Sequence, residues 1–301
     1  MLNKRPIFLN GFARGGTNLL VNLLISHPGV CISSGETHKV FKPGTRFDKG
    51  WLRIKKRLFY DYPIRILAGQ DIFNAHGYET RKKVPDYLKN YIDKIFYHGR
   101  FIANIESHNL YQYEGVKYTR EQLAECRLLS KGLDGITFTA ELLNEMYPDA
   151  TFFALVRNGL AICEGRTRRG YPVEKMGHNF NAVVDKMFSN REKLPNYHIV
   201  RYEDMVSNPQ QFMTNLYQIA GIDFSDIKKV RLESKAVMDK EGKHKLMKGH
   251  DRQVFWYEFD KLHEHIRSDI NENQIKQLDQ KTKDIFLSIA GDNMKKLGYI
   301  D

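Results

Sequence analysis

The chain has 301 residues, of which 42% are hydrophobic and 28% charged, and its formal net charge is +11. This composition is that of a folded globular protein and excludes wholesale disorder. No apolar run approaches the roughly 20 residues that span a bilayer, and the apolar stretch near the first residues is too short for the core of a signal peptide.

The cysteine content and the net charge indicate the cellular compartment and the kind of partner. The three cysteines are Cys31, Cys126 and Cys163, and no two of them form a CxxC pair. We therefore expect neither a disulfide framework nor a structural zinc site, and we expect a cytoplasmic, reducing environment. The excess of Lys and Arg favours an anionic partner. The basic clusters are scattered along the chain, which argues against a nucleic-acid-binding face.

Five short apolar runs are typical of buried parallel strands, and they cover residues 6–10, 30–33, 127–130, 151–156 and 197–202. Continuous rather than alternating apolarity fits strands that are covered on both faces. Helical patterns separate the runs, among them a leucine stripe at residues 19–24, a stripe at 142–146 and a segment 208–220 with capping signals at both ends. The sequence predicts an α/β fold, with a P-loop-like parallel sheet of about five strands flanked by helices.

Two longer stretches do not follow this alternation of strands and helices. Residues 37–126, between the second and third strands, are rich in Tyr, Phe, Lys and His and show no strand pattern. We expect a mainly helical insertion there. Because ligands of such sheets bind beyond the carboxyl ends of the strands, the insertion would form one side of the ligand-binding site. Residues 271–297 have apolar positions spaced for one buried helix face.

A glycine-rich turn follows the first strand. Gly11 and Gly16 are separated by four residues and precede a helix, an arrangement in which backbone N–H groups and the helix dipole hold a phosphate. The spacing matches the front of a P-loop, but Thr17 and Asn18 occupy the positions where a P-loop has Lys and Ser or Thr. Arg14 stands inside the turn instead. The turn is thus suited to a phosphate held without that lysine or a magnesium-binding hydroxyl.

An arginine, Arg157, follows the fourth strand directly. A guanidinium at the carboxyl end of a strand can bind a second phosphate through two parallel hydrogen bonds. A plain surface arginine is the alternative interpretation.

Three segments together resemble the PAPS-dependent sulfotransferases. RGGTN after the first strand is similar to their 5′-phosphosulfate loop, LVRNGLAICEG to their 3′-phosphate motif, and VRYEDMVSNPQQFMTNLYQIAGI to their Y-E-D-L-x-x-x-P segment. Order and spacing agree over residues 6–31 and 131–224. The arginine in the loop resembles the carbohydrate and bacterial glycolipid branches, whereas the cytosolic aryl branch has lysine there.

The resemblance implies a single sulfotransferase-like domain over residues 1–301, with the insertion 37–126 binding the acceptor. It implies transfer of a sulfuryl group from PAPS to a hydroxyl of a carbohydrate or glycolipid, with PAP as the product and no metal. The partners would be a small-molecule donor and this acceptor, with no nucleic acid; peripheral membrane contact and oligomeric state stay open.

The resemblance also implies roles for single residues. The 5′-phosphate would be held by Arg14, Gly15, Gly16, Thr17 and Asn18. The second phosphate would be held by Arg157, with further nucleotide contacts from Gly165, Tyr202, Lys248 and Arg252, and Lys131 would face the transferred group. Gly165 stands where the family has a serine and RNG replaces RDP, so the family's contacts to the 3′-phosphate do not carry over unchanged.

A general base is expected after the second strand. Glu36 stands where several relatives place a catalytic glutamate, and it needs a modestly raised pKa to accept a proton near neutrality. His38 is the rival, because an unperturbed imidazole titrates at about pH 6.5. The sequence favours Glu36 and leaves His38 open, both as base and as an acceptor-binding residue.

Three other functions compete with this one. A P-loop kinase of nucleotides or small molecules would require ATP and magnesium, and the missing Lys and Ser/Thr argue against it. A nucleic-acid-binding protein is suggested by charge alone. A member that binds PAP without catalysis is kept open by Gly165.

Overall fold

A computed structural model describes residues 5–41, 50–67, 83–106, 118–225, 227–234, 236–238, 244–246 and 253–301 of the chain. Its centre is a five-stranded sheet in the order β2-β3-β1-β4-β5, in which every pairing is parallel. The strands are β1 (Ile7–Gly11), β2 (Val30–Ile32), β3 (Arg127–Lys131), β4 (Thr151–Val156) and β5 (Tyr197–Arg201). The predicted α/β fold is confirmed, and each strand end lies within one residue of its predicted position.

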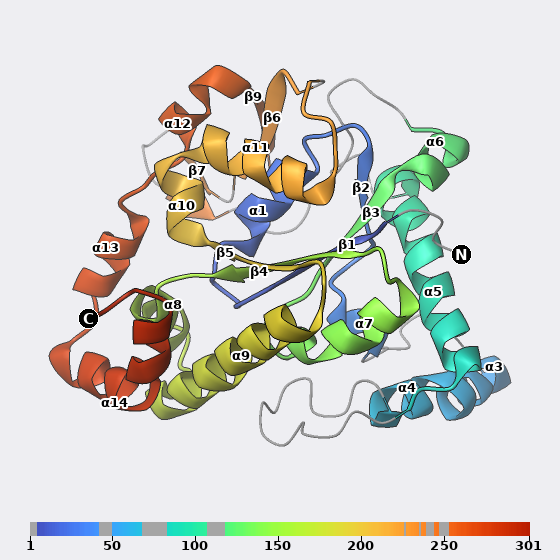
Figure 1. Cartoon of the computed structure of the whole chain (residues 1–301), viewed down its shortest axis with the longest axis horizontal. Helices are drawn as coiled ribbons and strands as arrows, with labels where there is room; N and C mark the ends of the chain where they lie inside the picture. Colours follow the sequence, from blue (N-terminus) through green and yellow to red (C-terminus); the bar gives the residue numbers. More distant parts are fainter. Residues whose placement is uncertain are drawn as a thin grey trace.

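Helices cover both faces of the sheet (Figure 1). One face carries α1 (Thr17–Leu24), α10 (Tyr202–Ser207) and α11 (Pro209–Ala220); the other carries α7 (Ala140–Met146), α8 (Gly159–Thr167), α9 (Val173–Lys193) and α14 (Gln280–Lys296). Alternate residues of β1 serve the two layers: Ile7 and Leu9 pack with α1 and α11, whereas Phe8 packs with α7 and α9. All three side chains are fully buried, which explains the continuous apolarity of the strand.

The insertion between β2 and β3 is helical wherever it is described, as the sequence predicts. It contains α2 (His38–Phe41), α3 (Gly50–Lys56), a π-helical segment (Arg57–Asp61), α4 (Tyr62–Leu67), α5 (Asp86–Phe101), a second π-helical segment (Ile102–Glu106) and α6 (Arg120–Glu125). A capping box at Thr119 and Gln122 begins α6, since each side chain accepts from the other residue's amide.

Two features of the C-terminal part differ from the sequence expectation. The predicted helix 271–297 is two helices, α13 (Ile270–Lys276) and α14, because Asp279 caps α14 by accepting from the amide of Thr282 at 2.8 Å. Short antiparallel pairs also occur, β6 (Lys229–Ser234) with β9 (Gln253–Glu258) and β7 (Ala236–Met238) with β8 (His244–Leu246), followed by α12 (Leu262–His265). The half-buried strand β6 alternates apolar and charged residues, a weaker signal than the continuous runs of the main sheet.

None of the helices in the described ranges has the length and apolarity needed to cross a bilayer. The three cysteines are buried, and none of them forms a disulfide within the described residues.

Candidate active site

The turn between β1 and α1 lies at the carboxyl edge of the sheet, and its backbone is left-handed at two positions. Arg14 has φ 73° and Gly16 has φ 91°. A Cβ at Gly16 would lie 2.3 Å from Cδ2 of Tyr202, and one at Gly15 would lie 2.9 Å from the carbonyl oxygen of Phe12. Both positions therefore require glycine, whereas Arg14 adopts its conformation at a cost of about 1–2 kcal/mol.

The amides at the start of α1 are available to an anion. Gly15 donates to the Phe12 carbonyl at 2.9 Å and Leu19 to the Gly16 carbonyl at 2.9 Å. Among the described residues, the amides of Gly16, Thr17 and Asn18 have no acceptor. These are the N–H groups that a helix leaves unsatisfied at its N-terminus, where the dipole also favours negative charge.

Two charged residues from other elements, Asp134 and Arg166, fasten this turn. Asp134, in a left-handed conformation with φ 48°, accepts from the Ala13 amide at 3.3 Å. The same carboxylate forms an ion pair with Arg166, whose Nε donates to the Ala13 carbonyl at 3.4 Å. Asp134 follows shortly after β3, so its position at the carboxyl edge of the sheet could have identified it as a site residue. Nothing in the sequence indicates that Arg166 is its partner.

Arg157 directly follows β4 and reaches the turn, where its guanidinium is engaged by the protein. It donates to the Arg14 carbonyl at 2.7 Å, to Asn271 Oδ1 at 2.7 Å and to Gln274 Oε1. Its Cζ lies 4.3 Å from the ring centroid of Tyr202. Burial lowers the pKa of Arg157. The residue thus connects the glycine-rich turn to α13, a contact that the sequence does not predict.

Carboxylates behind Arg157 hold the amide side chains of α13 in place. Glu164 accepts from Gln274 at 2.6 Å. Glu203 accepts from Asn271, from the Asn158 amide at 2.9 Å and from the Tyr299 hydroxyl at 2.8 Å. These bonds make Glu203 an anchor for α13, for the start of α8 and for the C-terminal Tyr299.

Gly165 makes room for Arg14. A Cβ on Gly165 would lie 3.2 Å from Cβ and 3.4 Å from Cγ of Arg14, so the arginine side chain packs across α8 at this glycine. The Nε of Arg14 is buried and has no hydrogen-bond partner in the part of the chain that the structure describes. Burial and the charges of Arg169, Arg168 and Arg157 lower the pKa of Arg14. Gly165 lies inside α8, where amides donate to carbonyls one turn earlier, so the expected N–H contact to a nucleotide is unfavourable.

Glu36, His38 and Lys131 come together at the ends of the paired strands β2 and β3. Lys131 Nζ lies 2.9 Å from Glu36 Oε1, and His38 Nδ1 lies 3.1 Å from Glu36 Oε2. The Thr37 amide donates to the Lys131 carbonyl at 2.7 Å, which ties the two segments together. Burial raises the pKa of Glu36, but the hydrogen bond from His38 and the charge of Lys131 lower it more, to about 2. The sequence analysis required a raised pKa, and the structure has the reverse.

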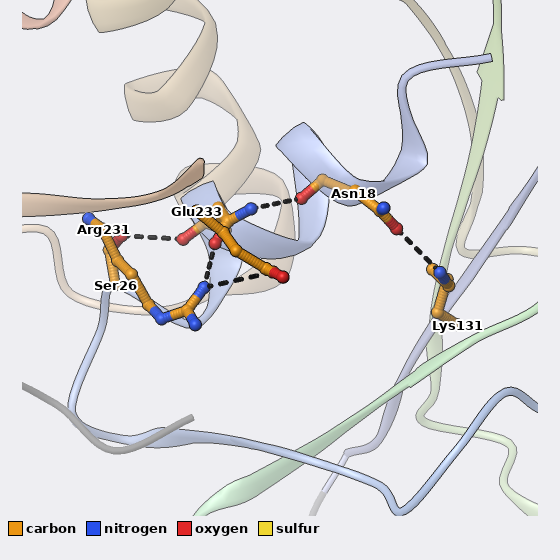
Figure 2. A network of polar contacts seen from close by, with 6 residues as sticks. Asn18, Ser26, Lys131, Arg231 and Glu233 are labelled. Atoms are coloured by element: carbon orange, nitrogen blue, oxygen red, sulfur yellow. Dashed lines mark hydrogen bonds and ion pairs between the residues drawn. The ribbon is translucent and has the colours of Figure 1, made fainter. Parts of the chain in front are cut away.

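Lys131 also joins this cluster to the phosphate-binding turn. Its Nζ donates to Asn18 Oδ1 at 2.8 Å, and Figure 2 shows the two side chains pointing toward one another. The site residues that the sequence predicted at the ends of β1, β2 and β3 thus form one continuous polar surface.

A buried polar row on α1 extends from Asn18 to β6 (Figure 2). Asn22 donates to the Asn18 carbonyl at 2.7 Å, and Ser26 donates to the Asn22 carbonyl at 2.7 Å. Arg231 on β6, only 1% exposed, donates to the Asn22 side chain, while its amide donates to Ser26 Oγ at 2.9 Å. Glu233 lies 4.0 Å from the same guanidinium. The row fixes α1 along its length.

Two predicted residues, Lys248 and Arg252, lie outside the described residues. Tyr202 is buried against Gly16, and its burial raises its pKa. The described residues contain no group of three or more His, Cys, Asp or Glu side chains placed to hold a metal ion.

Comparison with known proteins adds evidence of ancestry and fold. A family model described as "Sulfotransferase family" matches residues 6–226. The solved sulfotransferase domain of the curacin biosynthetic pathway is 13% identical, with a TM-score of 0.51 over 100% of this chain and 99% of that chain, and the two share a fold. None of the curated proteins compared with the chain matches it significantly.

Two further solved structures are similar at a lower level. The sulfotransferase domain from the Synechococcus PCC 7002 olefin synthase is 21% identical, with a TM-score of 0.42 over 75% of this chain and 77% of that chain. Mouse sulfotransferase SULT7A1, solved in complex with PAP, is 11% identical, with a TM-score of 0.44 over 97% of this chain and 85% of that chain.

Proposed function

The chain belongs to the sulfotransferase family, and from this we propose that it transfers a sulfuryl group from PAPS to a hydroxyl of a carbohydrate or glycolipid. One observation carries the proposal: Lys131 contacts both Asn18, at the unsatisfied start of α1, and Glu36, a carboxylate able to accept a proton. A phosphate-binding turn, a cation and a base therefore stand side by side, which is the set of groups that such a transfer uses.

The 5′-phosphate of the donor would bind at the amides of Gly16, Thr17 and Asn18. In the transfer step, the acceptor oxygen bonds to sulfur as the bond from sulfur to the bridging phosphate oxygen breaks. The acceptor proton goes to the base, and PAP leaves with the electron pair of the broken bond. We propose that Lys131 and the α1 amides stabilise the charge that grows on the bridging oxygen, so that no metal is needed.

Glu36 is proposed as the general base, and its contact with Lys131 controls its strength. While Lys131 lies against it, Glu36 has a pKa of about 2 and is a weak base. A donor sulfuryl group would attract Lys131, and Glu36 would then lose a positive neighbour and gain proton affinity. His38, hydrogen bonded to Glu36, orients the carboxylate in this scheme; it is also the rival base.

Arg157 is proposed to bind the second phosphate after an exchange of partners. The amide oxygens of Asn271 and Gln274 now occupy its guanidinium. The guanidinium is charged in both contacts, but a phosphate adds a negative charge and two oxygens that can accept parallel hydrogen bonds, so the nucleotide would displace α13 from Arg157.

Transfer of radiolabelled sulfur from PAPS tests the proposal directly. Purified full-length protein would be incubated with labelled donor and with separate sugar, glycolipid and phenol acceptors. Label on a sugar or glycolipid hydroxyl supports the proposal, and label on phenols alone overturns the acceptor class. Binding of PAP with no transfer to any acceptor would identify a non-catalytic nucleotide-binding protein.

A further inference from the structure

One helical segment turns apolar side chains outward. Residues 50–67 run without a break through α3, the π-helical segment and α4, a length of about 27 Å at the helical rise. Trp51 is 75% exposed and Leu58 is 59% exposed. We use the name apolar stripe for the large exposed side chains of this segment, which are Trp51, Ile54, Leu58, Phe59, Tyr62 and Ile66.

The opposite side of the segment attaches it to the protein. Ile64 is fully buried, in the same core cluster as Val40 and Phe41 of α2. Tyr60 stacks on Tyr91 of α5 with ring centroids 4.3 Å apart. The apolar stripe recurs every three or four residues, the period of one helix face, and it is not the face that makes these contacts. Figure 1 shows α3 and α4 at the periphery of the molecule, beyond the end of α5 and away from the sheet.

The segment is also strongly basic. Residues 50–67 contain five Lys or Arg residues and one acidic residue, Asp61. Asp61 is buried, whereas Lys55 is exposed beside the apolar stripe. A helix with one apolar face, an excess of Lys and Arg, and Trp and Tyr among its exposed residues has the pattern of helices that lie in the headgroup region of a membrane.

We propose that the apolar stripe docks on the surface of an anionic bilayer, with the helix axis in the plane of the membrane. The positive charge of the segment favours an anionic bilayer over a second copy of the chain as the binding partner. An isologous contact would bring two strongly basic segments together and desolvate their like charges, whereas anionic headgroups neutralise them. Docking does not depend on the proposed function.

One consequence does rest on the proposed function. Ile64, on the inner face of the docked segment, belongs to the same core cluster as Val40 and Phe41 of α2, and α2 begins at His38 beside Glu36. Membrane docking would therefore bring the acceptor side of the site toward the bilayer, where the hydroxyls of a glycolipid are presented.

Vesicle binding of the full-length protein tests the inference without any catalysis. The probes are phosphatidylcholine vesicles with and without about one third phosphatidylglycerol, whose negative charge attracts Lys and Arg. We expect co-sedimentation with the anionic vesicles and at least tenfold weaker binding for Leu58→Ser. The matched control is Ile219→Ser, a change of another exposed apolar side chain, 40% exposed, on α11. It should bind as the wild type does.

Fluorescence locates the contact on the protein. The chain has two tryptophans, Trp51 and Trp256, so a Trp256→Phe variant reports on Trp51 alone. Anionic vesicles should shift its emission to the blue and shield it from an aqueous quencher. Equal binding by the wild type and Leu58→Ser, or no binding to anionic vesicles, would overturn the proposal. A wild-type dimer that Leu58→Ser converts to a monomer would also overturn it, by assigning the stripe to a second copy.

Discussion

Lys131 Nζ lies 2.9 Å from Glu36 Oε1, and this ion pair joins the ends of two neighbouring parallel strands. Both side chains are largely buried, with 16% of Lys131 and 28% of Glu36 exposed. The pair therefore sets the charge state of the carboxylate before any substrate arrives, and its consequences are measurable in both rate and stability.

The pH dependence of kcat/KM distinguishes the two candidate bases. This quantity reports the free enzyme, in which Glu36 has a pKa of about 2. With Glu36 as base, kcat/KM should show no loss between pH 8 and pH 5, and Glu36→Gln should lower kcat about 10²-fold or more. An imidazole base would instead give an acid limb within this range. A large loss for His38→Ala together with a small one for Glu36→Gln would reassign the base.

Stability should depend on the same ion pair. The folded pKa of Glu36 is about 2, below the roughly 4.3 of an unfolded glutamate. Because the folded value is depressed, the stabilisation is complete above pH 5 and is lost as the pH falls toward 2. The free energy of unfolding of the wild type minus that of Glu36→Gln should fall by about 1–3 kcal/mol between pH 6 and pH 2. Urea titrations across this range measure it, and a constant difference would contradict the low pKa.

Nucleotide binding should depend on the turn and not on a metal. PAP should raise the Tm by several degrees without added magnesium, because a ligand that binds only the native state stabilises it. Arg14→Ala should reduce the shift and abolish transfer, while Arg267→Ala, which removes an arginine 70% exposed in its side chain, should change neither. A shift with MgATP and none with PAP would point to a kinase instead.

The contact between α13 and Arg157 should oppose nucleotide binding. Replacing Asn271 and Gln274 by Ala removes two hydrogen bonds from the charged guanidinium, each contributing about 1.5–3 kcal/mol. The double variant should melt at a lower temperature without ligand yet bind PAP about fivefold more tightly, as calorimetry would measure. The control is Asn273→Ala on the same helix, which bonds only to Asp269. Weaker PAP binding by the double variant would place the amides within the nucleotide site.

The buried end of the polar row should matter more to folding than any exposed arginine. Arg231→Met leaves the side-chain oxygen of Asn22 without its guanidinium partner in a buried environment. We expect a loss of about 1–3 kcal/mol in the free energy of unfolding. Arg267→Met should cost little, because exposed ion pairs contribute at most about 1 kcal/mol. Equal losses in urea titrations would show that the row does not stabilise α1.

The parts of the fold that the sequence predicts are those with local signals. Continuous apolar runs identify the five parallel strands, and Gly11, Gly16 and Arg14 identify the turn between β1 and α1. The places of Glu36 and Lys131 are each identified by the end of the strand that precedes them, although their ion pair is not. In each case the residue type and its position along the chain are sufficient.

Contacts between distant polar side chains are what the sequence does not predict. Asn271 and Gln274 bond to Arg157 across more than a hundred residues, and Asp134 meets Arg166 between separate elements. Amides and carboxylates are common on helix surfaces, so no local pattern marks these partners. The low pKa of Glu36 has the same origin, since it depends on which cation faces the carboxylate after folding.

The packing of Arg14 across Gly165 links two positions on different elements. A β-carbon on α8 would stand 3.2 Å from that of Arg14, closer than side chains normally approach without adjustment. A serine at position 165 would therefore require the Arg14 side chain to shift by a few tenths of an ångström. The residue type at position 165 and the conformation of Arg14 are thus coupled, so that a change on α8 is transmitted to the turn between β1 and α1.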